Sequence, residues 1–230
     1  MNKVYVWGDS IAKGIVFDAS RGRYVGLRER SGFAQAAEEM HIEMENHARF
    51  GMTSEKGRLA LENGIAQTQP GCPVLLGFGG NDVDFDWASI SQTPQDPHFP
   101  HVLPERFAEN MAQMVSMARR AGLIPVLLTL PPIDSQRYFD WVTRGLDTKE
   151  NVLKWLGDVE RIYRTHQSYS QLLTQVAQTL NVHLIDIRGA FEQAGSTLRK
   201  LCVDGIHPNA EGHDVIHRAL TSYAQAHAFG

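Results

Sequence analysis

Two short segments at opposite ends of the chain carry side chains that could act together in hydrolysis. Ser10 stands in Gly8-Asp9-Ser10, after the apolar run 4–7, so its hydroxyl would emerge just beyond a strand. Asp204 and His207 are three residues apart, and their side chains can share one turn. A serine, a histidine base and an orienting carboxylate are the parts of a nucleophilic hydrolase. This prediction requires a fold that brings the two ends of the chain together.

Two further residues could stabilise the negative charge that develops on an ester oxygen. Gly51 has no side chain to obstruct close approach to its backbone N–H, and the amide of Asn81 follows an apolar run that ends in Gly79-Gly80. With the backbone N–H of Ser10 they would form an oxyanion hole. Each motif is common in turns when it stands alone. We join them because each lies beyond a predicted strand.

The elements that must position these residues follow from the alternation of apolar runs and amphipathic segments. We predict strands within residues 4–7, 42–45, 73–78, 123–130 and 182–185. We predict helices over residues 31–40, from an N-cap at Ser54, and over 104–121, 151–180 and 209–227. Helical crossovers imply parallel pairing. The expected fold is α/β, a three-layer α/β/α sandwich around a five-stranded parallel sheet, which binds ligands at the carboxyl ends of its strands.

Two connections, at about residues 82–101 and 133–150, are longer than such a domain needs and are rich in aromatic residues. We interpret residues 1–230 as one domain with insertions there. Within the first insertion, Trp87 could stack on a sugar ring while carboxylates accept its hydroxyls. The alternatives are a structural loop with Trp87 in the core, or a calcium loop. We assign the following residues to substrate binding: Asp9, Asp82, Asp84, Trp87, Tyr138 and Trp141.

The second insertion has its own open alternatives. Tyr138 and Trp141 could belong to a lid or substrate wall, could cap the core, or could pack on a partner subunit. The oligomeric state is left open.

Composition excludes several classes of protein. The net charge is −4, without blocks of like charge, so neither a nucleic-acid footprint nor a polybasic membrane patch is expected. Cys72 and Cys202 have no metal-ligand spacing and are interpreted as free thiols, and His98 and His101 as loop residues. We expect no metal and no cofactor. The sequence shows neither a signal peptide nor an apolar run long enough to span a membrane, which favours a cytoplasmic protein.

These motifs, taken in order, resemble the SGNH hydrolases, the GDSL esterase and lipase family. The matching blocks are Gly8-Asp9-Ser10, Gly51, Gly79-Gly80-Asn81-Asp82 and Asp204-Gly205-Ile206-His207-Pro208. Ile11 replaces the usual leucine, and Arg49-Phe50 makes the second block divergent. The resemblance implies a flavodoxin-like fold, ester hydrolysis without a metal, and catalytic roles for Ser10, Gly51, Asn81 and His207.

We therefore expect a serine esterase that acts through an acyl-Ser10 intermediate on a small-molecule or oligosaccharide ester. The preferred substrate is an O-acetylated carbohydrate, and the alternative enzyme is a lysophospholipase or acyl thioesterase. A rival of another class is a non-catalytic carbohydrate-binding protein on the same scaffold. A flavin-binding protein of flavodoxin type is disfavoured because the chain has no convincing phosphate loop. An α/β-hydrolase is disfavoured because its nucleophile motif has glycine where this chain has Ala12.

Overall fold

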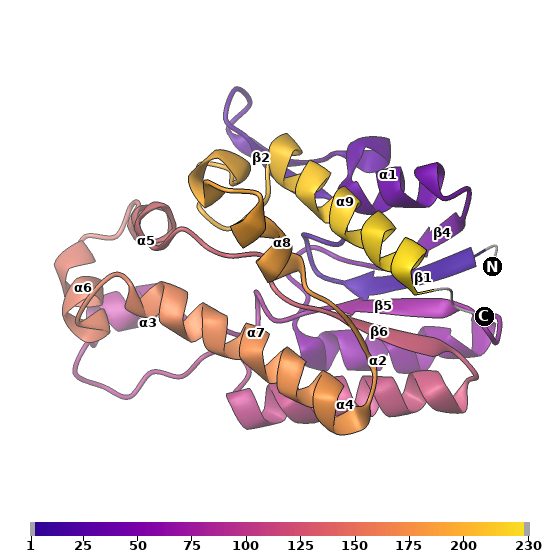
Figure 1. The fold of residues 1–230 in the computed structure, drawn as a ribbon. Helices are drawn as coiled ribbons and strands as arrows, with labels where there is room; N and C mark the ends of the chain where they lie inside the picture. Colours follow the sequence, from indigo (N-terminus) through magenta and orange to yellow (C-terminus); the bar gives the residue numbers. More distant parts are fainter. Residues whose placement is uncertain (1–2, 228–230) are drawn as a thin grey trace.

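A five-stranded parallel sheet lies at the centre of the computed structural model, which describes residues 3–227 (Figure 1). The strands lie in the order β4 (Glu43–Asn46), β1 (Lys3–Gly8), β5 (Pro73–Gly77), β6 (Ile124–Leu128) and β7 (His183–Ile185). The chain steps from β1 out to one edge and then crosses back toward the other edge. The predicted α/β fold and its five strands are confirmed, with small differences in where the strands end.

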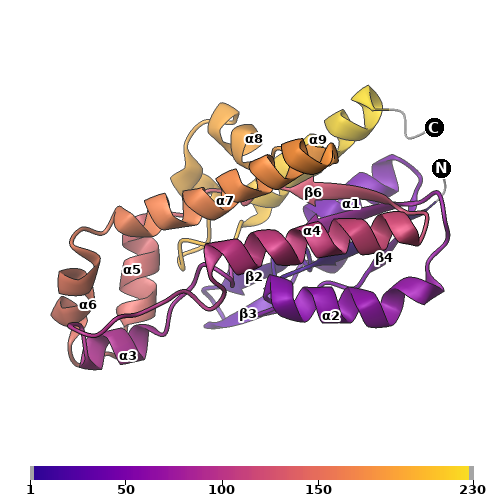
Figure 2. The same cartoon turned by 90° about the horizontal axis from the view of Figure 1, so that it is seen from below.

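Helices cover both faces of the sheet, as Figures 1 and 2 show. One layer consists of α2 (Ser54–Gly64), α4 (Pro104–Arg120) and α7 (Arg161–Leu180), whose apolar residues share a core with β1 and β5. The other layer consists of α1 (Gly32–Glu39), α8 (Ile187–Gln193) and α9 (Ala210–Ala226). Because the central strands are covered on both sides, their side chains are buried in runs rather than in alternation.

Three local predictions are corrected. The helix expected over 151–180 is two helices, α6 (Lys149–Leu156) and α7, separated after Gly157, which has a φ of 78°. The N-cap of α2 is Thr53 and not Ser54, because the Thr53 hydroxyl accepts the backbone N–H of Lys56. The backbone N–H and hydroxyl of Ser54 donate hydrogen bonds to Asp82 instead. The antiparallel hairpin of β2 (Ile15–Asp18) and β3 (Arg23–Gly26) was not predicted, and neither was α8.

Both long connections are structured. The first contains α3 (Trp87–Gln92) and is closed at its base by backbone hydrogen bonds from His101 to Asp84 (2.8 Å) and from Val102 to Asp82 (3.0 Å). The second contains α5 (Ser135–Thr143). Together with α6 and the start of α7 they form an apolar cluster that projects beyond the sheet at its carboxyl edge (Figure 2).

Candidate active site

Ser10 lies in the tight turn that follows β1. A Cβ on Gly8 would lie 2.6 Å from the Cβ of Ala12 and 2.8 Å from the Gly77 carbonyl oxygen, so the turn requires glycine there. The backbone N–H of Lys13 donates to the Asp9 carbonyl at 3.1 Å, and that of Ile15 donates to the Ser10 carbonyl at 2.9 Å. The turn holds the Ser10 hydroxyl at the carboxyl edge of the sheet.

The predicted triad residues form one continuous hydrogen-bonded chain. His207 Nε2 lies 2.9 Å from Ser10 Oγ, and His207 Nδ1 lies 2.7 Å from Asp204 Oδ2. The other carboxylate oxygen of Asp204 accepts the backbone N–H groups of Ile206 and His207. Burial alone would raise the pKa of Asp204, but the hydrogen bond and charge of His207 hold it below its ordinary value. This is the geometry of a serine nucleophile, a histidine base and an orienting carboxylate.

The turn that carries Asp204 and His207 is fixed by contacts on both sides. Gly205 has a φ of 75°, and a Cβ there would lie 2.6 Å from the backbone nitrogen of Tyr138 in α5. The backbone N–H of Asp134 donates to the Gly205 carbonyl, and that of Cys202 donates to the His207 carbonyl, both at 2.8 Å. The second insertion therefore supports the catalytic turn directly.

The candidate oxyanion-hole residues follow the strands on either side of β1. Beyond β4 the backbone N–H of Arg49 donates to the Gly8 carbonyl at 3.0 Å, which brings the next residues alongside Ser10. Gly51 has a φ of 69° and open space where a Cβ would be. Asn81 Nδ2 donates to the Met52 carbonyl at 3.3 Å. An amide nitrogen carries two hydrogens, so one can face a substrate.

The expectation that Asp9 and Asp82 bind substrate is wrong, because both carboxylates are buried and bonded to the protein. Asp9 accepts the N–H of Ile11 at 2.9 Å, and burial raises its pKa to about 6. Asp82 has no exposed surface and accepts both the N–H and the hydroxyl of Ser54. Burial raises the pKa of Asp82 to about 6, although these hydrogen bonds oppose the change. The two carboxylates hold the Ser10 turn and the start of α2.

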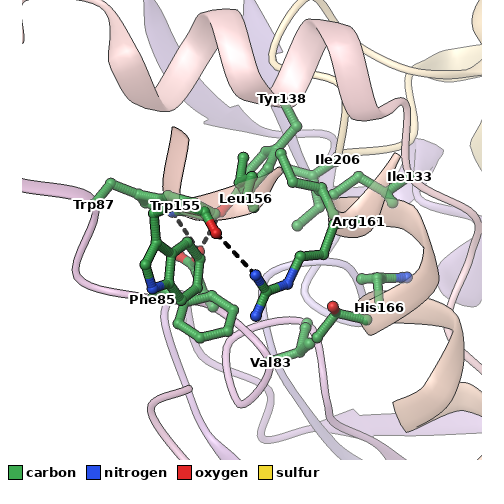
Figure 3. Close-up of a pocket in the computed structure, with 14 residues that line it drawn as sticks. Val83, Phe85, Trp87, Ile133, Tyr138, Trp155, Leu156, Arg161, His166 and Ile206 are labelled. Carbon is green, nitrogen blue, oxygen red and sulfur yellow. Dashed lines mark hydrogen bonds between the residues drawn. The ribbon is translucent and has the colours of Figure 1, made fainter. Parts of the chain in front are cut away.

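The sugar-platform interpretation of Trp87 is also wrong, and the structural alternative describes this side chain. Trp87 is only 9% exposed, and Asp84 Oδ1 accepts both its indole N–H (2.8 Å) and the Tyr138 hydroxyl (2.6 Å). Figure 3 shows the cavity that these residues border, which Trp155 and Arg161 also line. We call Asp84, Trp87, Tyr138 and Trp155 the buried aromatic group.

A second group of aromatic side chains lies beside His207. The ring of Tyr24 lies 5.0 Å from that of His207, and the Phe50 ring lies 6.1 Å away with its plane within 8° of parallel. Phe17 and Trp141 continue the group, with ring centroids 4.6 Å apart. We call Phe17, Tyr24, Phe50 and Trp141 the open aromatic group.

Of the open aromatic group, the sequence interpretation included Trp141 and missed the other three members. Two of these lie on the unpredicted hairpin. The signal for it was present: Ile15-Val16-Phe17 and Tyr24-Val25 are β-favouring runs on either side of a short polar turn.

The remaining predictions concern metals and membranes. Cys72 and Cys202 are free thiols, as predicted. Among residues 3–227 no cluster of three or more His, Cys, Asp or Glu side chains is placed to hold a metal ion. Within the same residues no helix is both long and apolar enough to cross a membrane.

A parallel α/β sheet with a hydrogen-bonded Ser–His–Asp chain at its carboxyl edge is typical of hydrolases with a serine nucleophile. The model of the GDSL-like lipase/acylhydrolase family matches residues 6–215, and the chain belongs to this family. It is an ester hydrolase, as the resemblance of its four blocks predicted.

The chain is also similar to individual proteins. An uncharacterized lipoprotein, YqeF, of Bacillus subtilis is 25% identical over 190 residues, which cover 80% of this chain and 69% of the lipoprotein. The crystal structure of a lipase/acylhydrolase from Enterococcus faecalis has a TM-score of 0.69 at 19% identity, covering 98% of this chain and 96% of that one. A mutant of an acetyl-xylooligosaccharide esterase from Geobacillus has a TM-score of 0.63 at 19% identity, covering 96% and 93%. At these identities the two structures show a shared fold.

Proposed function

We propose that the protein hydrolyses carboxylic esters through an acyl-Ser10 intermediate. The observation that carries this proposal is the hydrogen-bonded chain from Ser10 through His207 to the buried Asp204. His207 Nε2 takes the proton of Ser10 Oγ as that oxygen attacks the ester carbon. The same nitrogen then gives the proton to the departing alcohol, which leaves the acyl group on Ser10. A water molecule, deprotonated by His207, releases the acid.

The carbonyl oxygen becomes negative during both steps and needs donors. The backbone N–H groups of Ser10 and Gly51 and the side-chain amide of Asn81 supply them in this proposal. The hydrogen bond from Asn81 to the Met52 carbonyl supports it, because it connects the loops that follow β4 and β5 next to the nucleophile. Donors held in place before the reaction stabilise the oxyanion without further reorganisation.

The preferred substrate remains an O-acetylated carbohydrate, but the support for it changes. The Asp84–Trp87 segment no longer supports it, since those side chains are used within the fold. Two observations take its place. Aromatic rings stand beside His207, where the leaving alcohol must lie. One protein of similar fold is an acetyl-xylooligosaccharide esterase.

The acyl side of the site favours a short acyl group. Gly80 and Ile206, the chain neighbours of Asn81 and His207, border the cavity of Figure 3, which the large side chains of Trp87 and Tyr138 also line. A lysophospholipase or acyl thioesterase would need room for a long acyl chain at the same place.

The cytoplasmic location of the protein stays a prediction.

The experiment that tests the acyl preference is a series of 4-nitrophenyl esters from acetyl to octanoyl. A steep fall in kcat/KM beyond acetyl supports the short-acyl esterase, whereas a rise toward octanoyl overturns it in favour of the lipase or thioesterase. Labelling of Ser10 by a fluorophosphonate separates both enzymes from a non-catalytic carbohydrate-binding protein, which would not be labelled.

A further inference from the structure

The side chains around His207 determine what the leaving alcohol contacts. In the proposed reaction the proton travels from His207 Nε2 to the alcohol oxygen while the bond between that oxygen and the acyl carbon breaks. The group attached to the alcohol must therefore lie within reach of the His207 ring. Tyr24 and Phe50, which approach that ring from two different segments of the chain, are consequently placed to contact it.

The open aromatic group continues outward from these two rings. Tyr24 and Phe50 are 5.2 Å apart, and Trp141 lies 6.3 Å from Tyr24. The guanidinium of Arg144 stacks on the Trp141 ring at 3.2 Å. An aromatic surface thus runs from His207 to the end of α5, where the guanidinium of Arg144 lies at its outer end.

Exposure separates Tyr24, Phe50 and Trp141 from Trp87 and Tyr138, which are both buried. The Phe50 side chain is 54% exposed, and Tyr24 and Trp141 are partly exposed. Phe50 belongs to none of the buried apolar clusters that form the core. Exposed aromatic rings beside a reactive group are the usual material of a ligand-binding surface.

The hairpin that carries Tyr24 is fixed relative to the nucleophile. At the start of its first strand, the backbone N–H of Ile15 donates to the Ser10 carbonyl at 2.9 Å. Just after its second strand, the backbone N–H of Leu27 donates to the Gly14 carbonyl at 2.8 Å. Burial, together with the nearby negative charge of Asp204, raises the pKa of the Tyr24 hydroxyl, which therefore stays neutral beside the triad. The surface is therefore built before a substrate arrives.

We propose that Tyr24, Phe50 and Trp141 form the subsite for the leaving alcohol and that its ligand is a sugar ring. The C–H face of a pyranose would stack on the aromatic rings while its hydroxyls face Arg144 and water. This inference rests on the proposed carbohydrate esterase activity and gives it a location. The subsite is separate from the Asp84–Trp87 segment on which the sequence interpretation relied.

The test compares two acetate esters that differ in the leaving alcohol. An acetylated xylooligosaccharide can reach Phe50, whereas the ethanol of ethyl acetate is too small to do so. In Phe50→Ala we expect kcat/KM for the sugar ester to fall about tenfold, the size of one lost stacking contact. For ethyl acetate we expect a change within about twofold, because the triad is intact.

Phe99→Ala is the matched control, since Phe99 is 67% exposed and lies in the first insertion. It should change neither rate. Equal losses on both esters, or no loss on the sugar ester in Phe50→Ala, would overturn the subsite while leaving the esterase activity standing. Failure of the native protein on the sugar ester alone would overturn both the carbohydrate preference and the subsite. Failure on both esters would overturn the acyl-Ser10 proposal and the subsite with it.

Discussion

The two aromatic groups near the site differ in what their polar atoms do. In the buried aromatic group, a single carboxylate oxygen of Asp84 accepts hydrogen bonds from Trp87 and Tyr138, and the rings are packed among helices α3, α5, α6 and α7. In the open aromatic group, Phe50 is 54% exposed, and the rings of Tyr24 and Phe50 lie beside His207. Both groups follow strands of the sheet, so position along the chain does not tell them apart. The difference teaches that burial and hydrogen bonding decide which aromatic residues a substrate can use.

The largest effect is expected for Ser10, the proposed nucleophile. Ser10→Ala should lower kcat by about 10⁴-fold or more, because no other hydroxyl is positioned on His207 Nε2. The free energy of unfolding, measured in urea, should change little. A variant that kept substantial activity would show that the reaction does not pass through Ser10.

The next largest effect is expected for Asn81, the proposed side-chain donor to the oxyanion. Asn81→Ala should lower kcat by about 10²- to 10³-fold through loss of one oxyanion donor, with KM nearly unchanged. Steady-state kinetics on ethyl acetate checks this, since that ester does not depend on the open aromatic group. A change confined to KM would assign Asn81 to ground-state binding instead.

The buried aromatic group should control stability and not the binding of the sugar. Asp84→Ala leaves the indole N–H of Trp87 and the hydroxyl of Tyr138 without their acceptor, and should lower the free energy of unfolding by about 2–4 kcal/mol. KM for an acetylated oligosaccharide should stay as it is.

Asp96→Ala is the control for Asp84→Ala, because Asp96 is an exposed carboxylate of the same insertion and its loss should cost within about 0.5 kcal/mol. If Asp84→Ala raised KM without lowering the free energy of unfolding, the sugar would bind at the first insertion and not at the open aromatic group.

A pH dependence of stability is expected from Asp82. Burial raises its folded-state pKa to about 6, above the ordinary value of 3.8. Between these two pH values the folded protein keeps a proton that the unfolded chain loses, so the contribution of Asp82 to stability falls as the pH rises. Asp82→Asn removes this contribution. Relative to the native protein, the variant should gain about 2–3 kcal/mol between pH 4 and pH 7.

Urea unfolding of both proteins at several pH values measures how the difference in their free energies of unfolding changes with pH. The substitution also alters hydrogen bonds, but that effect is the same at every pH and does not change the slope. A difference that does not vary with pH would mean that Asp82 is ionised in the folded protein throughout this range.

The smallest effect is expected for the hydroxyl of Tyr24. Tyr24→Phe keeps the ring in the open aromatic group but removes the hydroxyl, which lies near the charge of Asp204. We expect kcat/KM to fall less than about tenfold, and to the same extent on the sugar ester and on ethyl acetate. Tyr138→Phe, the same change in the buried aromatic group, should leave both rates unchanged. A loss limited to the sugar ester would place the hydroxyl itself in contact with the sugar.

The sheet and the triad could be predicted from the sequence because both depend on local signals. A parallel sheet collects at one edge whatever follows its strands, so Ser10, Asn81 and the Asp204–His207 turn were expected to meet there. The hairpin was missed because its strands have four residues each and lie outside the main sheet.

The fate of Trp87 could not be predicted, because it depends on packing from a distant part of the chain. The ring centroid of Trp155 lies 6.5 Å from that of Trp87, and the ring centroid of Tyr138 lies 6.1 Å from it. Because these two rings pack against Trp87, its side chain is part of the interior and not of the surface. The same holds for Asp82, whose carboxylate meets Ser54 from 28 residues away. Acidic and aromatic residues in a long loop indicate either a binding surface or a buried hydrogen-bonded core, and only tertiary contacts separate the two.

The acyl-Ser10 intermediate can be observed directly. The protein is mixed with an acetyl ester in excess, quenched in acid during the first turnovers, digested, and its peptides are weighed by mass spectrometry. The account predicts one added acetyl group on the peptide that contains Ser10, formed and lost at rates that match turnover, and no such peptide in Ser10→Ala. Release of acid at the full rate without any acetyl on Ser10, or with the acetyl on another residue, would contradict it.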